Sequence, residues 1–335
     1  IKLHDCSDCF LNADAIFFIK NRNVYKKCLY DGAQTLIASD LSDDLLYVDN
    51  RWVLTSCYDY LNSITYILYD QLNKEKIEIG TPALFELDSF LYTHLQSNFT
   101  FDWFRTNKSS PNRSVIISVY EGFDVDNEAL ISEQDQELWL NKGNDIIVFN
   151  AFKKIKADNP FLSNTQIKLK SLAILASLSN DCKKMYGYSS CLLVGVSHGG
   201  MMVISCALTY PGAADAIVAI SPIVNLQAIY NSYYYLFWKK EFELDDGNYY
   251  LQLCPTYLLS QTKESIKGLI MTFEGDKIID SKEVTHFCNK CKGHRLKHVH
   301  FEYAKGHATY SDKTSINEGY NTVYSWIYRE ILSSV

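Results

Sequence analysis

The stretch that decides the fold is Val194-Gly195-Val196-Ser197-His198-Gly199-Gly200. The apolar residues 191–194 come before it, and the small and apolar residues 201–208 follow it without a helix breaker. The order strand, sharp turn, helix is the setting of a nucleophile elbow, in which the serine is held in a strained conformation. A side chain at either flanking glycine would clash, and the first N–H groups of the helix would face a developing oxyanion. The stretch therefore predicts a nucleophilic serine, the alternative being a surface serine on a glycine-rich turn.

Strands and helices alternate around this stretch. Apolar runs of strand length recur through the second part of the chain, at residues 114–120, 145–150, 216–220, 269–273 and 298–303. Leucines at helical spacing predict a helix near residues 165–184, and a last helix is predicted over residues 317–332. This alternation indicates a doubly wound, mostly parallel sheet, and with the elbow it predicts an α/β-hydrolase domain over residues 98–335.

Residues 1–97 have a different pattern, in which short strands end in turns. Strands that end in an aromatic residue and an Asp turn, as in Tyr69-Asp70, are typical of propeller blades. A closed propeller needs at least about four blades, and this region has room for about two. We therefore expect a β-rich, partial propeller-like or cap region. We expect its open sheet edges to be covered by the hydrolase domain, by another chain, as in a homo-oligomer, or by a missing segment.

The composition limits the classes of partner. The net charge of −7 argues against a nucleic-acid partner, and no apolar run is long enough to span a membrane. Several of the ten cysteines lie inside apolar runs, as Cys191 and Cys206 do, which is typical of reduced core cysteines. These features favour a cytoplasmic protein.

Two pairs of cysteines have Cys-x-x-Cys spacing, Cys6 with Cys9 and Cys288 with Cys291. Together the two pairs could form a zinc site. The alternative is coincidence, because the second pair lies one turn apart on a predicted helix. We expect that the chemistry requires no metal and no organic cofactor.

An acid and a histidine follow the serine in the order typical of this fold. Asp276 comes just after the strand that ends at Phe273, and His307 follows the next strand. Side chains at the carboxyl ends of parallel strands converge, so His307 could take the serine proton while Asp276 holds the imidazole. Asp280, on the same loop, is the competing acid, and we prefer Asp276 because it lies nearer the end of the strand.

Five segments of the second part resemble, in the same order, the sequence motifs of one known family. They are residues 118–123, 138–143, 195–200, 221–225 and 274–279. Over roughly residues 98–334 the chain resembles the prolyl oligopeptidase family of serine peptidases. The resemblance implies a catalytic triad of Ser197, Asp276 and His307. It implies oxyanion donors at the Tyr120 hydroxyl and the His198 backbone N–H, and a proline-stacking ring at Trp238. The implied activity is cleavage of a peptide after proline, through an acyl-enzyme on Ser197.

The sequence departs from the family pattern near the site. Glu121 stands where the family has a glycine, His198 where it often has Asn or Ala, and residues 152–154 replace an Arg-Gly-Gly turn. Ile278 occupies the substrate-binding position of an arginine that grips the peptide backbone in prolyl-cleaving members. Two alternatives therefore stay open. One is an esterase or thioesterase that acts on a small acyl substrate with the same triad. The other is a non-catalytic binding protein on a hydrolase scaffold.

Overall fold

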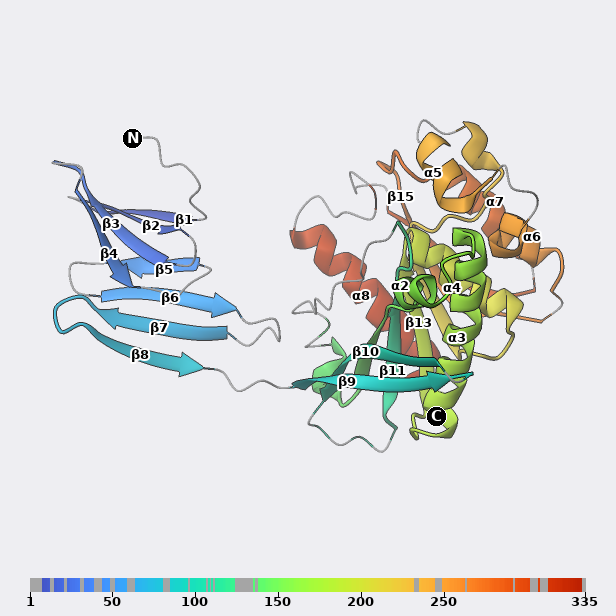
Figure 1. Ribbon diagram of the computed structural model, residues 1–335, viewed down its shortest axis with the longest axis horizontal. Helices are drawn as coiled ribbons and strands as arrows, with labels where there is room; N and C mark the ends of the chain where they lie inside the picture. The colour runs from blue at the N-terminus through green and yellow to red at the C-terminus, as the bar shows by residue number, and fades with distance from the viewer. Residues whose placement is uncertain are drawn as a thin grey trace. The chain divides into compact units, whose positions relative to one another are not determined.

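The computed structural model describes residues 8–12, 15–20, 23–30, 33–38, 44–48, 52–58, 64–80, 85–95, 97–106, 108, 110, 112–123, 135, 138–231, 235–244, 249–262, 264–291, 293–301, 307 and 313–332. The chain divides into two compact units after residue 84 (Figure 1). In the part that is described, no helix is both long and apolar enough to cross a membrane.

The first unit contains two antiparallel sheets of four strands each, with the strands in chain order. The first sheet consists of β1 (Asp8–Asn12), β2 (Ala15–Lys20), β3 (Asn23–Cys28) and β4 (Gln34–Ala38). The second consists of β5 (Asp44–Val48), β6 (Trp52–Tyr58), β7 (Ile64–Asp70) and β8 (Glu75–Gly80). Four-stranded sheets are the building block of a propeller. The described strands of this unit thus make two small antiparallel sheets, which agrees with the predicted β-rich region, while the propeller-like arrangement stays a prediction.

The two sheets share one apolar core. Phe17 and Val24 of the first sheet lie in the same buried cluster as Val53 and Ile67 of the second. The turn after β7 is fixed by Asp70, whose carboxylate accepts hydrogen bonds from the N–H groups of the residues two and three positions further on. This is the aromatic-Asp turn on which the expectation of blades depends.

The second unit is built on one sheet of eight strands, in the order β16-β15-β14-β13-β11-β12-β10-β9. Its strands are β9 (Phe85–His94), β10 (Ser97–Thr106), β11 (Ser114–Val119), β12 (Asp145–Phe149), β13 (Ser190–Val196), β14 (Ala216–Ile220), β15 (Lys267–Phe273) and β16 (Arg295–Phe301). Strands β11 to β16 pair in parallel, whereas β10 pairs antiparallel with β12 and β9. The predicted α/β-hydrolase fold is confirmed.

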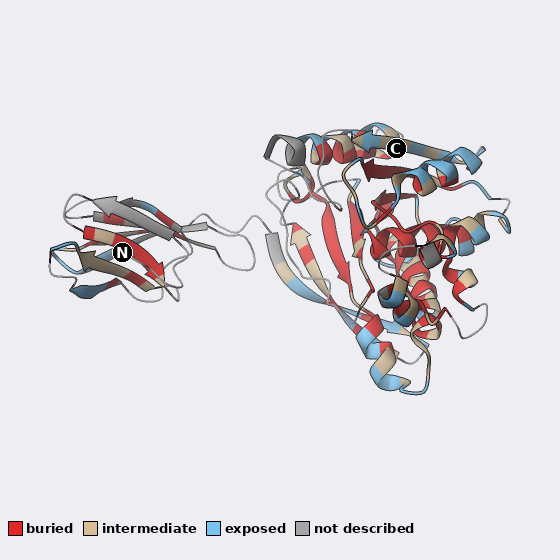
Figure 2. Ribbon diagram, turned by 90° about the horizontal axis from the view of Figure 1, so that it is seen from above, coloured by how far each residue is buried: buried red, intermediate tan, exposed pale blue. Residues whose placement is uncertain are grey.

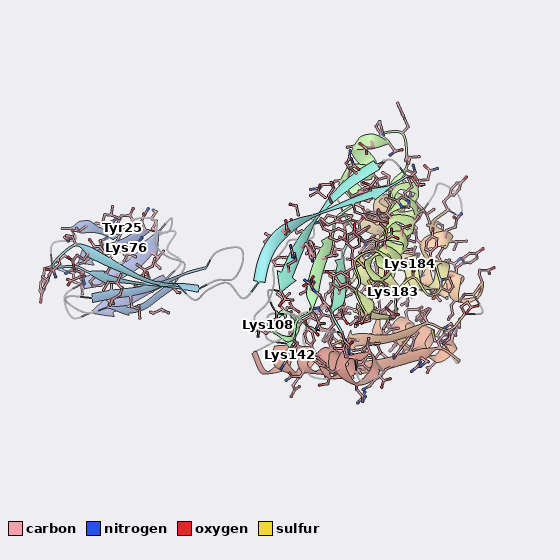
Figure 3. All side chains as sticks on the ribbon, turned by 90° about the horizontal axis from the view of Figure 1, so that it is seen from below. Tyr25, Lys76, Lys108, Lys142, Lys183 and Lys184 are labelled. Carbon is pink, nitrogen blue, oxygen red and sulfur yellow. The ribbon has the colours of Figure 1, made fainter. Side chains whose placement is uncertain are left out.

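Helices lie between the parallel strands along the chain and after the last of them. They are α2 (Phe152–Asp158), α3 (Asn164–Lys184), α4 (His198–Thr209), α5 (Tyr235–Phe242), α6 (Pro255–Leu259), α7 (Ser281–Lys290) and α8 (Lys313–Glu330). Three short 3-10 helices are η1 (Leu140–Lys142), η2 (Ala228–Asn231) and η3 (Tyr249–Leu253). Helix α3 begins with a capping box between Ser163 and Gln166. It ends in the basic pair Lys183 and Lys184 (Figure 3), whose charges favour the negative end of the helix dipole.

The core of the second unit lies between the sheet and its helices. Figure 2 shows buried residues along most of the strands. Helix α4 is buried from His198 to Leu208, so it packs as a central element against the sheet rather than as a surface helix. The elbow that joins β13 to α4 is therefore held rigidly from both sides.

The division between the units falls earlier than residue 97, the boundary that the sequence suggests. Strand β9 pairs with β10 along its whole length, from Phe85 opposite Thr106 to His94 opposite Ser97. Both strands of this hairpin belong to the second sheet, because β10 also pairs with β12. The sequence of an antiparallel hairpin at a sheet edge has the same pattern as the short antiparallel strands before it. The sequence alone therefore assigns the first strand of this hairpin to the wrong unit.

The described cysteines are free thiols. They are Cys28, Cys182, Cys191, Cys206, Cys254, Cys288 and Cys291. Within the described ranges, no three His, Cys, Asp or Glu side chains gather as metal ligands. Cys6 lies outside those ranges, as do the side-chain contacts of Cys9, so the alternatives of a shared zinc site and of coincidence both stay open.

Candidate active site

Ser197 stands on the turn between β13 and α4, in a backbone conformation that few residues adopt. Its φ is 55° and its ψ is −113°. A non-glycine residue held in such a region costs on the order of 1–3 kcal/mol, so the surrounding structure must impose it. The Ser197 N–H donates to the Ile220 carbonyl at 2.8 Å, and the Ser197 carbonyl accepts from the Met201 N–H at 3.1 Å. These bonds hold the turn to β14 and to the first turn of α4.

The flanking glycines are required by close approach of the backbone. A Cβ atom at Gly195 would lie 2.2 Å from the Gly199 carbonyl oxygen. A Cβ atom at Gly199 would lie 1.9 Å from the Val119 carbonyl oxygen. Real carbon atoms do not approach this closely, so both positions tolerate only glycine. The steric reason predicted from the sequence holds at both positions.

The site lies where the strand order reverses. Strand β11 has β12 on one side and β13 on the other, so the chain leaves β11 in one direction for β12 and returns for β13. In an open α/β sheet, ligands bind at the carboxyl ends of strands beside such a switch point. Tyr120 directly follows β11 and Ser197 directly follows β13, so both lie at this position.

Asp276 and His307 form a hydrogen-bonded pair. The Nδ1 atom of His307 lies 2.9 Å from Oδ2 of Asp276 and 3.1 Å from its Oδ1. Burial acts to raise the pKa of the Asp276 carboxyl. The hydrogen bonds from His307 and from the backbone N–H groups of Ile279 and Ile278 outweigh burial and hold this pKa below its usual value. Asp276 is therefore ionised and accepts from Nδ1–H, which leaves Nε2 as the basic atom of the ring.

The competing acid, Asp280, has a different position. Its Oδ1 accepts a hydrogen bond from the Lys282 N–H at 2.9 Å, which makes it the N-cap of α7. Asp276 therefore contacts the histidine, and Asp280 caps a helix. No hydrogen bond among the described residues joins Ser197 Oγ to His307, and such bonds are often long in unliganded enzymes.

Tyr120 and His198, the two predicted oxyanion donors, directly follow β11 and begin α4. Burial raises the pKa of the Tyr120 hydroxyl, and the nearby Glu241 carboxylate raises it further, so the hydroxyl stays a neutral donor. His198 is the first residue of α4, and its backbone N–H has no acceptor within the helix. The His198 side chain makes a separate contact, in which Nδ1 of the ring lies 2.8 Å from the Tyr120 carbonyl oxygen. The sequence does not reveal this ring contact.

Trp238 and Ile278 line one pocket of about 520 Å³, together with Pro222 and Asp276. The Trp238 ring is nearly buried and lies almost parallel to Phe242, with ring centres 5.9 Å apart. The structure thus brings both predicted substrate-binding residues into one cavity beside the Asp276–His307 pair. The cavity wall is apolar at Ile278.

The chain is similar to known proteins in part of its sequence and in its fold. Residues 182–333 match the sequence model of the prolyl oligopeptidase family. No curated protein sequence matches the chain significantly. Among solved structures, an acylaminoacyl peptidase from Pyrococcus horikoshii is similar, with a TM-score of 0.61 and 16% sequence identity. Oligopeptidase B from Leishmania major matches with a TM-score of 0.69 and 9% identity, and a post-proline cleaving enzyme from Rickettsia typhi with 0.62 and 15%.

These matches cover most of this chain but only part of the other proteins. They cover 96%, 98% and 95% of this chain, and 55%, 52% and 50% of the three structures in the order given. The chain thus spans about half the length of the solved structures that it matches. At these identities the likeness shows a shared fold.

Proposed function

We propose that this chain, which carries a prolyl oligopeptidase family domain, is a serine peptidase that cleaves peptides after proline through an acyl-enzyme on Ser197. The observation that carries the proposal is the strained serine at the switch point, on the sheet whose next loops hold the Asp276–His307 pair. An intact set of this kind argues against a non-catalytic binding protein.

The residues divide the reaction between them. The Ser197 Oγ attacks the carbonyl carbon of the scissile bond, and its proton passes to Nε2 of His307. Asp276, being ionised, stabilises the imidazolium. The Tyr120 hydroxyl and the His198 N–H donate to the oxyanion. The amine leaves with the proton from His307, and a water deprotonated by the same ring then hydrolyses the acyl-enzyme.

The expected specificity depends on Trp238. Proline is rigid and lacks an N–H, so a flat indole can stack on its ring without leaving a donor unpaired. Burial of such a ring is worth about 1.5–3 kcal/mol, or at least about tenfold in selectivity. We expect the wild type to cleave peptides with Pro before the scissile bond at least about tenfold faster than peptides with Ala.

The measurement is kcat/KM for the two peptides in the wild type, in Trp238→Ala and in Trp238→Phe. Trp238→Ala should lose the preference, whereas Trp238→Phe keeps an aromatic ring and should retain part of it. A wild type that cleaves both peptides equally fast, or a ratio that Trp238→Ala leaves unchanged, would rule out a proline pocket.

An esterase or thioesterase is the second candidate, and Ile278 favours it. An isoleucine in the pocket wall offers no hydrogen bond to a peptide backbone. A panel of proline peptides and short acyl esters separates the two candidates. If the enzyme hydrolyses only the esters, the proposed peptide substrate is wrong, whereas the assignment of Ser197 as the nucleophile is retained.

Tyr120→Phe tests the oxyanion site, because it keeps the ring and removes only the hydroxyl. Loss of one such donor typically costs about 2.7–4 kcal/mol of barrier, a hundredfold to thousandfold in turnover. We therefore expect kcat to fall by that factor with little change in substrate affinity. Unchanged turnover, measured where chemistry limits the rate, would remove Tyr120 from the mechanism.

We also propose a cytoplasmic location. Its support is the free and fully buried thiols of Cys182, Cys191 and Cys206, which behave as small core residues. We also propose a homo-oligomer. The two sheets of the first unit have open edges, and a second copy of the chain could cover them.

A further inference from the structure

A group of charged and polar side chains is buried beside the predicted oxyanion donors. This group, called here the rear cluster, consists of Glu121, Lys168, His198 and Glu241. Each is at most 6% exposed, and they come from the segment after β11 and from helices α3, α4 and α5. Burying charges is costly unless they are paired and hydrogen-bonded. A cluster of this kind in the core therefore needs an explanation.

An ion pair lies at the centre of the rear cluster. The Lys168 Nζ lies 2.6 Å from Oε1 of Glu241, and His198 Nε2 lies 3.9 Å from the same oxygen. Burial, together with the nearby charge of Lys168, lowers the pKa of His198 to about 3, so this ring is neutral. Its Nδ1 carries the proton, because the Tyr120 carbonyl that it contacts can only accept.

Three hydrogen bonds of the rear cluster hold the segment 120–123, at residues 120, 121 and 123. His198 Nδ1–H donates to the Tyr120 carbonyl at 2.8 Å. Glu121 Oε1 accepts from the Ala151 N–H at 2.6 Å. Glu241 Oε1 accepts from the Phe123 N–H at 2.9 Å. The segment is thereby tied to α4, to the start of α2 and to α5.

The backbone of the segment 120–123 is in a strained conformation. Glu121 and Phe123 have φ values of 58° and 57°, in the left-handed region that side chains disfavour. Between them, a Cβ atom at Gly122 would lie 2.8 Å from Cγ of His198, so the ring packs directly on the glycine backbone. Two strained residues and one close contact indicate that the surrounding side chains impose the conformation.

We propose that Glu241, with Lys168 as its counter-charge, is a positioning residue that fixes the segment 120–123 and thereby holds the Tyr120 hydroxyl as an oxyanion donor. The inference rests on the proposed function of Ser197 and Tyr120. It assigns to Glu241 no contact with the substrate. Its effect on turnover passes through the hydrogen bond to the Phe123 N–H.

A matched pair of double variants isolates this hydrogen bond. Lys168→Met with Glu241→Gln removes both charges but keeps an acceptor for the Phe123 N–H. Lys168→Met with Glu241→Met removes the acceptor as well. Replacement of a buried ion pair by side chains of similar size is often tolerated, so both variants are expected to fold. If the second does not, Lys168→Met with Glu241→Leu replaces it.

The assay is hydrolysis of p-nitrophenyl butyrate, with active sites counted by fluorophosphonate titration. Counting sites removes any loss that is due only to unfolded protein. We expect the methionine variant to have a kcat per titrated site about tenfold below that of the glutamine variant, the cost of one hydrogen bond. We expect KM to stay nearly unchanged. Equal kcat values would overturn the proposal.

The same pair in a Tyr120→Phe background gives the second readout. If Glu241 acts through the Tyr120 hydroxyl, the difference between the two variants should vanish when that hydroxyl is absent. A difference that persists would mean a general structural role and would overturn the proposal. A wild type that does not titrate at all would instead count against the proposed serine hydrolase, so the two failures are distinguishable.

Discussion

Ser197→Ala is expected to abolish hydrolysis of every substrate that the wild type cleaves. The substitution keeps the Cβ atom and hence the packing of the elbow, where φ is 55°, but removes the oxygen that attacks. In a well-measured serine protease, loss of the nucleophile lowers kcat by about 10⁶. The measurement is kcat per folded protein, on a proline peptide and on an acyl ester.

The control for Ser197→Ala is Ser260→Ala, a change at an exposed serine whose Oγ donates to the Tyr257 carbonyl and accepts from Nε2 of the neighbouring Gln261. It should leave turnover at the wild-type value. Substantial hydrolysis by Ser197→Ala, with the Ser260→Ala enzyme unchanged, would mean that the reaction does not pass through an acyl-enzyme on Ser197.

Asp276→Asn is expected to have the second-largest effect. The ionised carboxylate accepts the Nδ1–H of His307 at 2.9 Å and so keeps Nε2 basic. An asparagine can present its N–H₂ group to Nδ1 instead, which favours the wrong tautomer. A change of this kind costs about 10⁴ in kcat in a related triad. The measurement is kcat at neutral pH.

The matched control is Asp280→Asn, on the same loop. Its carboxylate caps α7, and asparagine is also a good N-cap, so turnover should stay near the wild-type value. If Asp280→Asn lowered kcat as much as Asp276→Asn, the assignment of the acid would be wrong.

The parallel part of the fold could be predicted because each element carries its own signal. The run at residues 216–220 is a buried strand over those residues, and the helix predicted near residues 165–184 is α3. Fully buried parallel strands read as continuous apolar runs, and α3 shows a helical period. The hairpin of β9 and β10 was harder to place, because its membership of the second sheet depends on pairing with β12, far away in sequence.

The candidate site could be predicted for those residues whose chemical type and whose position at the end of a strand both indicate a catalytic role. Ser197 lies between two glycines, Gly195 and Gly199, which the close approach of the backbone at the elbow requires. Asp276 and His307 follow neighbouring parallel strands, whose carboxyl ends lie at the same edge of the sheet. The rear cluster was not predictable in this way. Lys168 sits on the apolar stripe of α3 four residues before Leu172, which is a signal, but its partner Glu241 is fixed only by tertiary packing.

The most direct test of the account is to locate the site of covalent modification. The wild-type chain is incubated with a fluorophosphonate and digested, and the modified peptide is sequenced by mass spectrometry. The account predicts one adduct on Ser197, no adduct in Ser197→Ala, and much slower formation in His307→Ala. Modification of a different residue, or equal modification of the wild type and Ser197→Ala, would contradict it.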